Sequence, residues 1–175
     1  MILFKAGHKD YVDKLADYRK TRSFREGGRW NSPGTPALYF SSNVQNAMLE
    51  LRTYLPDPVV ANTVNVMGVF QTPPLRLIHL RPDELPSGWH QYPYPTQTQI
   101  TGDRYLLDEN YDGFVVPSCA INHDLAESTY NDVRQSIYAK VIVNPERKAI
   151  QEALLLEKHS PIYSARAFSA LKGDL

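Results

Sequence analysis

The stretch EGGRWNSPGTPALYFSSNVQNAMLE, residues 26–50, contains three kinds of local structure in succession. Residues 26–36 hold three glycines and two prolines, a composition typical of a turn. Residues 37–41, ALYFS, form a short β-prone run. A helical pattern follows and places Glu50 among mostly apolar neighbours. The rest of the chain is interpreted around this turn, strand and helix.

The helix in this stretch has signals at both ends. Ser42 offers an N-cap, and Gln45 follows it at the spacing of a capping box. Pro56 lacks an amide hydrogen and therefore stops a helix. The sequence predicts a helix over about residues 43–55.

The rest of the chain alternates between strand-like and helix-like patterns. Helical spacing predicts a helix over residues 8–20, and residues 97–107 are a candidate for another. Polar composition predicts a loop over 122–136. The tail, 146–168, is ambiguous, because helical and strand periods both fit residues 149–159. Nothing divides the chain, so we expect a single α+β domain over residues 1–175, with more strands than helices. The further predicted strands are residues 1–7, 59–71, 74–80, 114–121 and 137–145.

The composition is that of an ordinary globular protein. The 175 residues are 42% hydrophobic and 22% charged, which is enough to bury a core without disulfides. The 19 basic and 19 acidic residues balance to a net charge of +0, so bulk charge predicts no nucleic-acid-binding face. The start, MILFKAGHKD, is unlike a signal peptide, and no apolar run approaches membrane-spanning length. The single cysteine suits a reducing compartment, so we expect a cytoplasmic protein.

Several common kinds of site are missing from the sequence. The five histidines are scattered, and none has a second ligand at the spacing of a zinc motif. The sequence has no phosphate-binding loop, no dinucleotide-binding fingerprint and no nucleophile elbow. Cys119 lies in an apolar run and is expected to be an inert buried thiol. We therefore expect neither a metal nor a bound cofactor.

Three residues of the opening stretch are candidates for a site, and each also has a structural interpretation. Arg29 follows two glycines and presents a planar fork suited to phosphate or carboxylate, or it lies in a surface turn. Tyr39 contacts a ligand or is a core tyrosine with its hydroxyl hydrogen-bonded. Glu50 is a costly buried carboxylate, or it pairs with a base at the helix border.

The order of these residues resembles the RES domain family, which is named for its Arg, Glu and Ser. The family pattern has Gly-Arg-Trp-Asn, a glycine turn, a tyrosine on a strand, Ala-x-x-Glu on the next helix and a serine after a proline in a late strand. The matching residues are Gly28, Arg29, Trp30, Asn31, Gly34, Tyr39, Ala47, Glu50, Pro117 and Ser118.

Later parts of the chain also resemble the family, with two departures. The first strand carries Lys5 where family members tend to have arginine, and the connection at about 122–136 is longer than usual. The weaker matches are Gly102 with Asp103, Asn144 with Pro145, and Arg166 near the end.

The resemblance implies a mixed, split β-sheet similar to that of ADP-ribosyltransferase toxins, flanked by a few helices. It also implies a toxin that depletes NAD by cleaving the nicotinamide–ribose bond, as a glycohydrolase or a phosphorylase, with NAD as substrate. Two alternatives stay open: a mono-ADP-ribosyltransferase that modifies a protein, and an inactive binding domain of the same fold. The partner implied is a helix-turn-helix antitoxin or an immunity protein, with no direct binding to nucleic acid or membrane.

The same resemblance assigns roles to four residues. Glu50 is expected to stabilise the cationic ribose, because bond cleavage leaves positive charge on that ring. Arg29 is expected to hold a phosphate or ribose of NAD, and Tyr39 to stack on the nicotinamide. Ser118 is expected to hydrogen-bond the ribose or to position Glu50.

Overall fold

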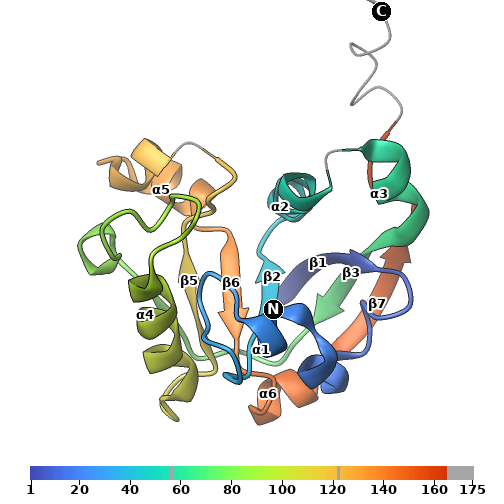
Figure 1. The fold of residues 1–175 in the computed structure, drawn as a ribbon, viewed down its shortest axis with the longest axis horizontal. Helices are drawn as coiled ribbons and strands as arrows, with labels where there is room; N and C mark the ends of the chain where they lie inside the picture. Colours follow the sequence, from blue (N-terminus) through green and yellow to red (C-terminus); the bar gives the residue numbers. More distant parts are fainter. Residues whose placement is uncertain (56, 122, 165–175) are drawn as a thin grey trace, which may run out of the picture.

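The computed structural model describes residues 1–55, 57–121 and 123–164. Its core is one mixed seven-stranded sheet, flanked by helices, in the order β4-β5-β6-β2-β1-β3-β7 (Figure 1). The predicted α+β class is therefore confirmed. The strands are β1 (Ile2–His8), β2 (Leu38–Ser41), β3 (Asn65–Gln71), β4 (Leu77–His79), β5 (Gly113–Val116), β6 (Lys140–Val143) and β7 (Leu154–His159).

The sheet has two halves that meet at a narrow junction. The register between β1 and β2 consists of the pair Phe4 and Ser41, whereas β1 pairs with β3 along its whole length. One half is therefore β4-β5-β6-β2 and the other is β1-β3-β7, which agrees with the expected split sheet. Strands β4 and β5 are parallel, and the other neighbouring strands are antiparallel.

Helices cover both halves of the sheet. Helix α2 contacts β1 and β2 at the junction, α3 contacts β3, and α4 contacts β5 (Figure 1). The described helices are η1 (Leu15–Lys20), α1 (Arg22–Glu26), α2 (Val44–Tyr54), α3 (Pro58–Val64), η2 (Pro82–Glu84), α4 (Thr96–Leu107), η3 (His123–Glu127), α5 (Asn131–Ile137) and α6 (Lys148–Gln151), where η marks a 3₁₀ helix.

The core has two clusters, one on each face of the sheet, because side chains alternate along a strand. Leu3, Phe40, Phe70 and Val141 belong to the first cluster, which Tyr18 of η1 completes. The second cluster includes Trp30, Leu106, Phe114 and Ile142, with Tyr39 packed against it. The buried Trp30 thus joins the glycine-rich turn to the second face.

Two helix predictions need correction. Residue 8 ends β1, and residues 9–20 form turns and the 3₁₀ helix η1 instead of an α-helix. Asp17 has a non-helical ψ of 19° inside η1. The N-cap of α2 is Asn43, whose Oδ1 accepts a 2.8 Å hydrogen bond from the Asn46 amide. Ser42 lies one residue before this cap, and its amide continues the sheet pairing by donating to the Ala139 carbonyl, 2.9 Å away. Helix α2 ends before Pro56, which lies outside the described residues.

The strand predicted over 59–71 is wrong in its first half, which is helix α3. Asp57 caps this helix by accepting hydrogen bonds from the amides of Val59, at 2.8 Å, and Val60, at 3.3 Å. This cap and the proline at the start of the helix outweigh the β propensity of the valines. Strand β3 accounts for the second half.

Later segments also differ from the predictions. The strand expected over 114–121 ends at Val116, so Ser118 follows the strand instead of lying in it. The segment 122–136, predicted as a loop, contains η3 and most of α5. The ambiguous tail forms α6 and then β7, and its last residues, 165–168, lie outside the described part.

Candidate functional site

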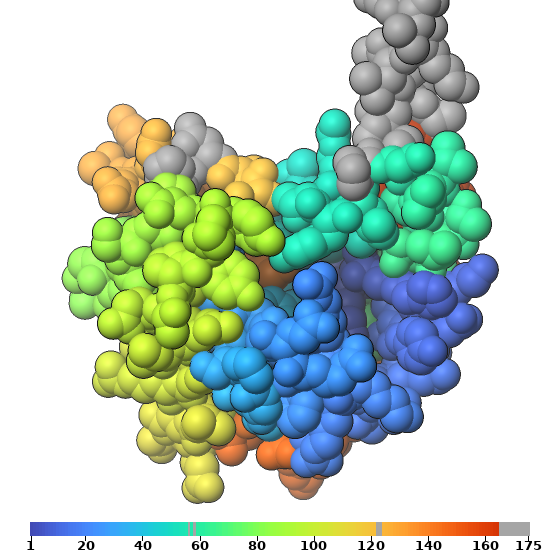
Figure 2. Space-filling model, viewed as in Figure 1, coloured from blue at the N-terminus to red at the C-terminus, as the bar shows by residue number. Residues whose placement is uncertain are grey.

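A hollow opens above the junction of the two half-sheets. Figure 2 shows it between α2, the segment that precedes α4 and the glycine-rich turn. Strands β2 and β6 run beneath it, and their register pairs Ser41 with Lys140 and Tyr39 with Ile142. Residues at alternate positions share a face, so Tyr39 and Lys140 point toward the same side as α2. The hollow therefore collects side chains from a strand pair, a helix and a turn.

Glu50 of α2 is held through both carboxylate oxygens. Ser118 Oγ donates a 2.8 Å hydrogen bond to Oε1, and Lys140 Nζ lies 3.0 Å from Oε2. The side chain of Glu50 is 16% exposed, and Ser118 is almost fully buried. A carboxylate at this depth needs such partners to offset its lost hydration. The structure thus brings two predicted site residues, Glu50 and Ser118, into direct contact.

Lys140 is a site residue that the sequence reasoning missed. It begins β6, its side chain is 15% exposed, and its Nζ lies 5.5 Å from the centroid of the Tyr39 ring. This geometry suits a cation–π contact in addition to the ion pair with Glu50. The available signal was a lysine at the start of the apolar run KVIV, a position where a charge is costly without a partner.

The Tyr39 hydroxyl is hydrogen-bonded to residues of the glycine-rich turn. It donates a 2.7 Å hydrogen bond to Asn31 Oδ1 and accepts one of 3.1 Å from the Trp30 amide. A Cβ on Gly28 would lie 2.6 Å from this hydroxyl, so glycine is required there. Burial raises the pKa of Tyr39, which keeps the hydroxyl protonated as a donor. Any contact of Tyr39 with a ligand is therefore through its ring.

Arg29 is hydrogen-bonded to the segment that follows η2. Its Nη1 donates hydrogen bonds to the carbonyls of Trp89, at 2.7 Å, and Gln91, at 2.6 Å, and its guanidinium carbon lies 5.2 Å from the Tyr94 ring centroid. Within the described part of the chain, the structure shows no hydrogen bond from its Nε or Nη2, which leaves donors for an anion. Among the described residues, the structure shows no ion pair between Arg29 and Glu50.

Cys119 follows Ser118 at the edge of the hollow. Its thiol is half-buried and 3.9 Å from the Trp89 carbonyl oxygen. Burial raises the pKa of the Cys119 thiol to about 11, and the charges of Arg29, Glu50 and Lys140 act on it as well. The fields of all three charged groups therefore reach the Cys119 thiol.

Comparison with known proteins shows which family the chain belongs to. The model of the RES domain matches residues 2–131. A Toxin Res of Yersinia enterocolitica serotype O:8 / biotype 1B is 30% identical over 130 residues, which cover 73% of this chain and 74% of that protein. A Toxin Res of Photorhabdus laumondii subsp. laumondii is 27% identical over 124 residues, covering 71% of this chain and 78% of that protein.

The chain belongs to the RES domain family. The match to the RES domain includes the turn, Tyr39, Glu50 and Ser118, but it ends before Lys140. The second cation of the site therefore lies in the part of the chain beyond the match.

The Gly-Asp pair of this RES domain supports the turn that bears Arg29. A Cβ on Gly102 would lie 1.9 Å from the Trp30 carbonyl oxygen, so α4 and the turn approach more closely than any other residue allows. Asp103 Oδ1 accepts a 2.9 Å hydrogen bond from the Ser32 amide. Both residues act on the turn and not on the hollow itself.

Lys5, another position of the RES pattern, lies away from the site. Lys5 neighbours Phe4 in β1 and points to the opposite face, where its Nζ lies 5.9 Å from the Phe40 ring centroid. Burial lowers the pKa of Lys5 to about 8, although the charge of Asp13 opposes this. Arg166 lies outside the described residues.

Neither a metal site nor a membrane span is found in the part of the chain that the structure describes. No group of three or more His, Cys, Asp or Glu side chains there is arranged to hold a metal ion. None of the helices there has the length and apolar character that crossing a bilayer requires. A pocket of about 350 Å³ on the other side of α2 is lined mainly by apolar residues, including Phe4, Met48 and Met67, which suits a dinucleotide poorly.

Proposed function

We propose that this chain is a toxin that depletes NAD by cleaving the bond between nicotinamide and ribose. The observation that carries the proposal is the Glu50 carboxylate, held by Ser118 and Lys140 in a hollow of a RES domain. Two relatives named as toxins support the biological role. We also propose that the toxin acts in the cytoplasm, because loss of NAD there harms the cell.

The chemistry of the reaction fits these side chains. The bond between ribose C1′ and the pyridinium nitrogen breaks, and its electron pair leaves with nicotinamide as a neutral base. The ribose ring carries positive charge in the transition state, as in glycoside hydrolysis. Water then adds at C1′ and releases a proton, which gives ADP-ribose. Little proton transfer to the leaving group is needed, so a positioned carboxylate matters more than a general acid.

The proposal gives each residue a task in this step. A carboxylate has about four acceptor positions, so Glu50 can accept from Ser118 and pair with Lys140 while it still accepts from ribose hydroxyls. Arg29 would bind a phosphate through Nε and Nη2. The Tyr39 ring would stack against nicotinamide, and Ser118 would hold Glu50 instead of the ribose.

The test replaces the carboxylate with an amide of the same shape. Purified Glu50→Gln protein is expected to release nicotinamide from NAD about 10²–10³ times more slowly than the unaltered protein, because one electrostatic stabiliser is lost. Release is measured by chromatography, and growth and cellular NAD are followed in bacteria that express each protein. Expression of the unaltered chain should lower NAD, whereas expression of Glu50→Gln should not.

The matched control is Glu26→Gln. Glu26 is a half-exposed residue that pairs with Arg22 at 2.7 Å on α1, and its replacement should leave the rate unchanged. Equal NAD consumption by Glu50→Gln and the unaltered protein would exclude the assigned role. No NAD consumption by the unaltered protein, even with phosphate and a cell lysate present, would exclude the activity and would leave the binding-domain alternative.

A second assay identifies what receives the ribose. NAD labelled in its adenylate moiety is incubated with the protein and a cell lysate, with or without phosphate. Free ADP-ribose indicates hydrolysis, its phosphorylated form indicates phosphorolysis, and a labelled protein indicates ADP-ribosyl transfer. We further propose a neutralising protein partner, either an antitoxin or an immunity protein, because an active NAD-cleaving enzyme harms the cell that makes it.

A further inference from the structure

Lys140 is placed where a cation is costly. Its side chain is 15% exposed and stands at the start of a strand whose next three residues are all buried. The long aliphatic stem packs while the ammonium group reaches Glu50 Oε2 at 3.0 Å and the Tyr39 ring at 5.5 Å. An apolar residue would suit this position of the strand equally well. Folding alone therefore does not explain why the position carries a charge.

The contacts of Glu50 show what Lys140 adds. Glu50 lies on α2, which packs at the β1–β2 junction, whereas Ser118 follows β5 and Lys140 begins β6. Ser118 constrains Oε1 alone, and a carboxylate fixed at one oxygen still rotates about its last bond. Lys140 constrains Oε2 and thereby sets the direction of the carboxylate plane. Lys140 brings no negative charge of its own to the site, so what it adds to Glu50 is the direction of the carboxylate.

We propose that Lys140 is a positioning residue for NAD cleavage, which aims the Glu50 carboxylate at the ribose of NAD from the opposite side to Ser118. This inference rests on the proposed function. It adds a residue that lies beyond the part of the chain matched by the RES domain. Lys140 itself does not touch the reacting atoms, because its ammonium group is occupied by Glu50 and by the Tyr39 ring.

The test compares Lys140→Met, which keeps most of the side chain's length and removes the charge, with Lys140→Arg, which keeps the charge. Lys140→Met is expected to lower kcat about 10- to 100-fold with little change in the KM for NAD, because a misaimed group impairs the transition state and not binding. Lys140→Arg should recover a large part of kcat. The matched control is Lys148→Met on α6, where the lysine side chain is 88% exposed, and this variant should keep the full rate.

A double-mutant cycle separates positioning from a general structural effect. If Lys140 acts through Glu50, adding Lys140→Met to Glu50→Gln should lower kcat no further, because the group to be aimed is already lost. An additive loss in the double variant would overturn the proposal. So would an unchanged kcat in Lys140→Met, or a rise in KM alone, which would mean direct contact with NAD.

A stability measurement keeps the two proposals distinguishable. If the unaltered protein does not consume NAD, the proposed function fails. The unaltered protein, Glu50→Gln, Lys140→Met and the double variant are then unfolded in urea. Non-additive changes in stability would show that Lys140 holds Glu50 in the folded protein, so that only the activity was misassigned. Additive changes would overturn the positioning role as well.

Discussion

At the scale of single residues, the site is a set of matched donors and acceptors. Glu50 has a donor for each oxygen, and the Tyr39 hydroxyl both donates to Asn31 and accepts from Trp30. The buried oxygens of Glu50 and Tyr39 are thereby satisfied. Cys119 differs from these residues, because its thiol donates to the distant Trp89 carbonyl and burial disfavours its ionised form.

The Cys119 thiol is predicted to react slowly. Burial raises its pKa to about 11, and only the thiolate is a good nucleophile. Alkylation by iodoacetamide at pH 8 should therefore be about 100-fold slower than in the urea-unfolded chain, and the rate should keep rising up to about pH 11. Mass spectrometry of samples quenched at intervals measures both rates. Equal rates in the folded and unfolded chains at pH 8 would contradict the prediction.

At the scale of elements, close packing decides how the site is supported. Helix α4 has a glycine where its surface meets the Trp30 backbone, and this allows the turn to lie directly on the helix. Asp103, the next residue on α4, bonds the Ser32 amide and fixes the same contact. The turn then presents Arg29 to the hollow on one side and buries Trp30 on the other. Here α4 acts on the site only through the turn.

The direction in which Gly102→Ala changes the unfolding free energy tests this close packing. In an exposed helix, alanine is more stable than glycine by about 1 kcal/mol. At position 102 the added methyl would meet the Trp30 carbonyl, so we expect the variant to lose about 1–3 kcal/mol of unfolding free energy. Urea unfolding measures the change. Gln97→Ala, at an exposed position of the same helix, is the control and should change stability by less than about 0.5 kcal/mol.

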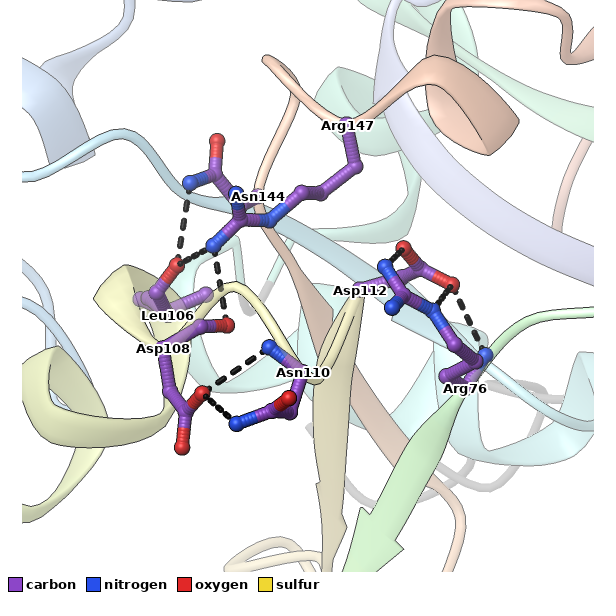
Figure 3. Close-up of polar contacts among 7 residues, drawn as sticks. All are labelled: Arg76, Leu106, Asp108, Asn110, Asp112, Asn144 and Arg147. Carbon is purple, nitrogen blue, oxygen red and sulfur yellow. Dashed lines mark hydrogen bonds and ion pairs between the residues drawn. The ribbon is translucent and has the colours of Figure 1, made fainter.

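At the scale of the whole molecule, polar anchors join segments that are distant in sequence (Figure 3). Asn144 and Arg147, just after β6, both donate to the Leu106 carbonyl at the end of α4, at 3.0 and 3.1 Å. Asp112, before β5, accepts hydrogen bonds from the Arg76 amide and guanidinium, each at 2.8 Å. These contacts hold α4 and three strands of one half-sheet together behind the site.

The Asp112 anchor predicts a dependence of stability on pH. Burial would raise the pKa of Asp112, but hydrogen bonds from Arg76 outweigh this and hold the pKa below its usual value. The folded state therefore binds protons less readily than the unfolded state, so this stabilisation is complete above about pH 5 and is lost as the pH falls through the range below about 4. Asp112→Asn should cost about 1–2 kcal/mol at pH 7, because Arg76 is itself largely exposed, and the difference should narrow toward pH 3.

Urea unfolding at a series of pH values measures this difference. The control is Asp83→Asn, in which an exposed carboxylate 3.2 Å from the exposed Arg81 is removed. That variant should lie within about 0.5 kcal/mol of the unaltered protein at every pH. A cost for Asp112→Asn that stayed constant down to pH 3 would mean that the carboxylate charge is not what stabilises the anchor.

The sequence alone determined the local structure wherever local forces dominate. Residues 37–41 and 97–107 were predicted correctly as a strand and a helix, and at 37–41 β propensity acts without opposition. The order of Arg29, Tyr39, Glu50 and Ser118 was enough to indicate the family, which the comparison confirmed. The errors at 59–71 and at the N-cap of α2 arose where a side-chain cap or a sheet hydrogen bond outweighed local preference.

Only the tertiary structure decided which side chains meet. Lys140 is far from Glu50 in sequence, and nothing in a strand pattern says which residue stands above which. That choice is made by the register of β2 against β6 and by the docking of α2 at the junction, both of which depend on long-range packing. The residue types of the site follow from the sequence, but the pairing that aims the carboxylate exists only in the folded sheet.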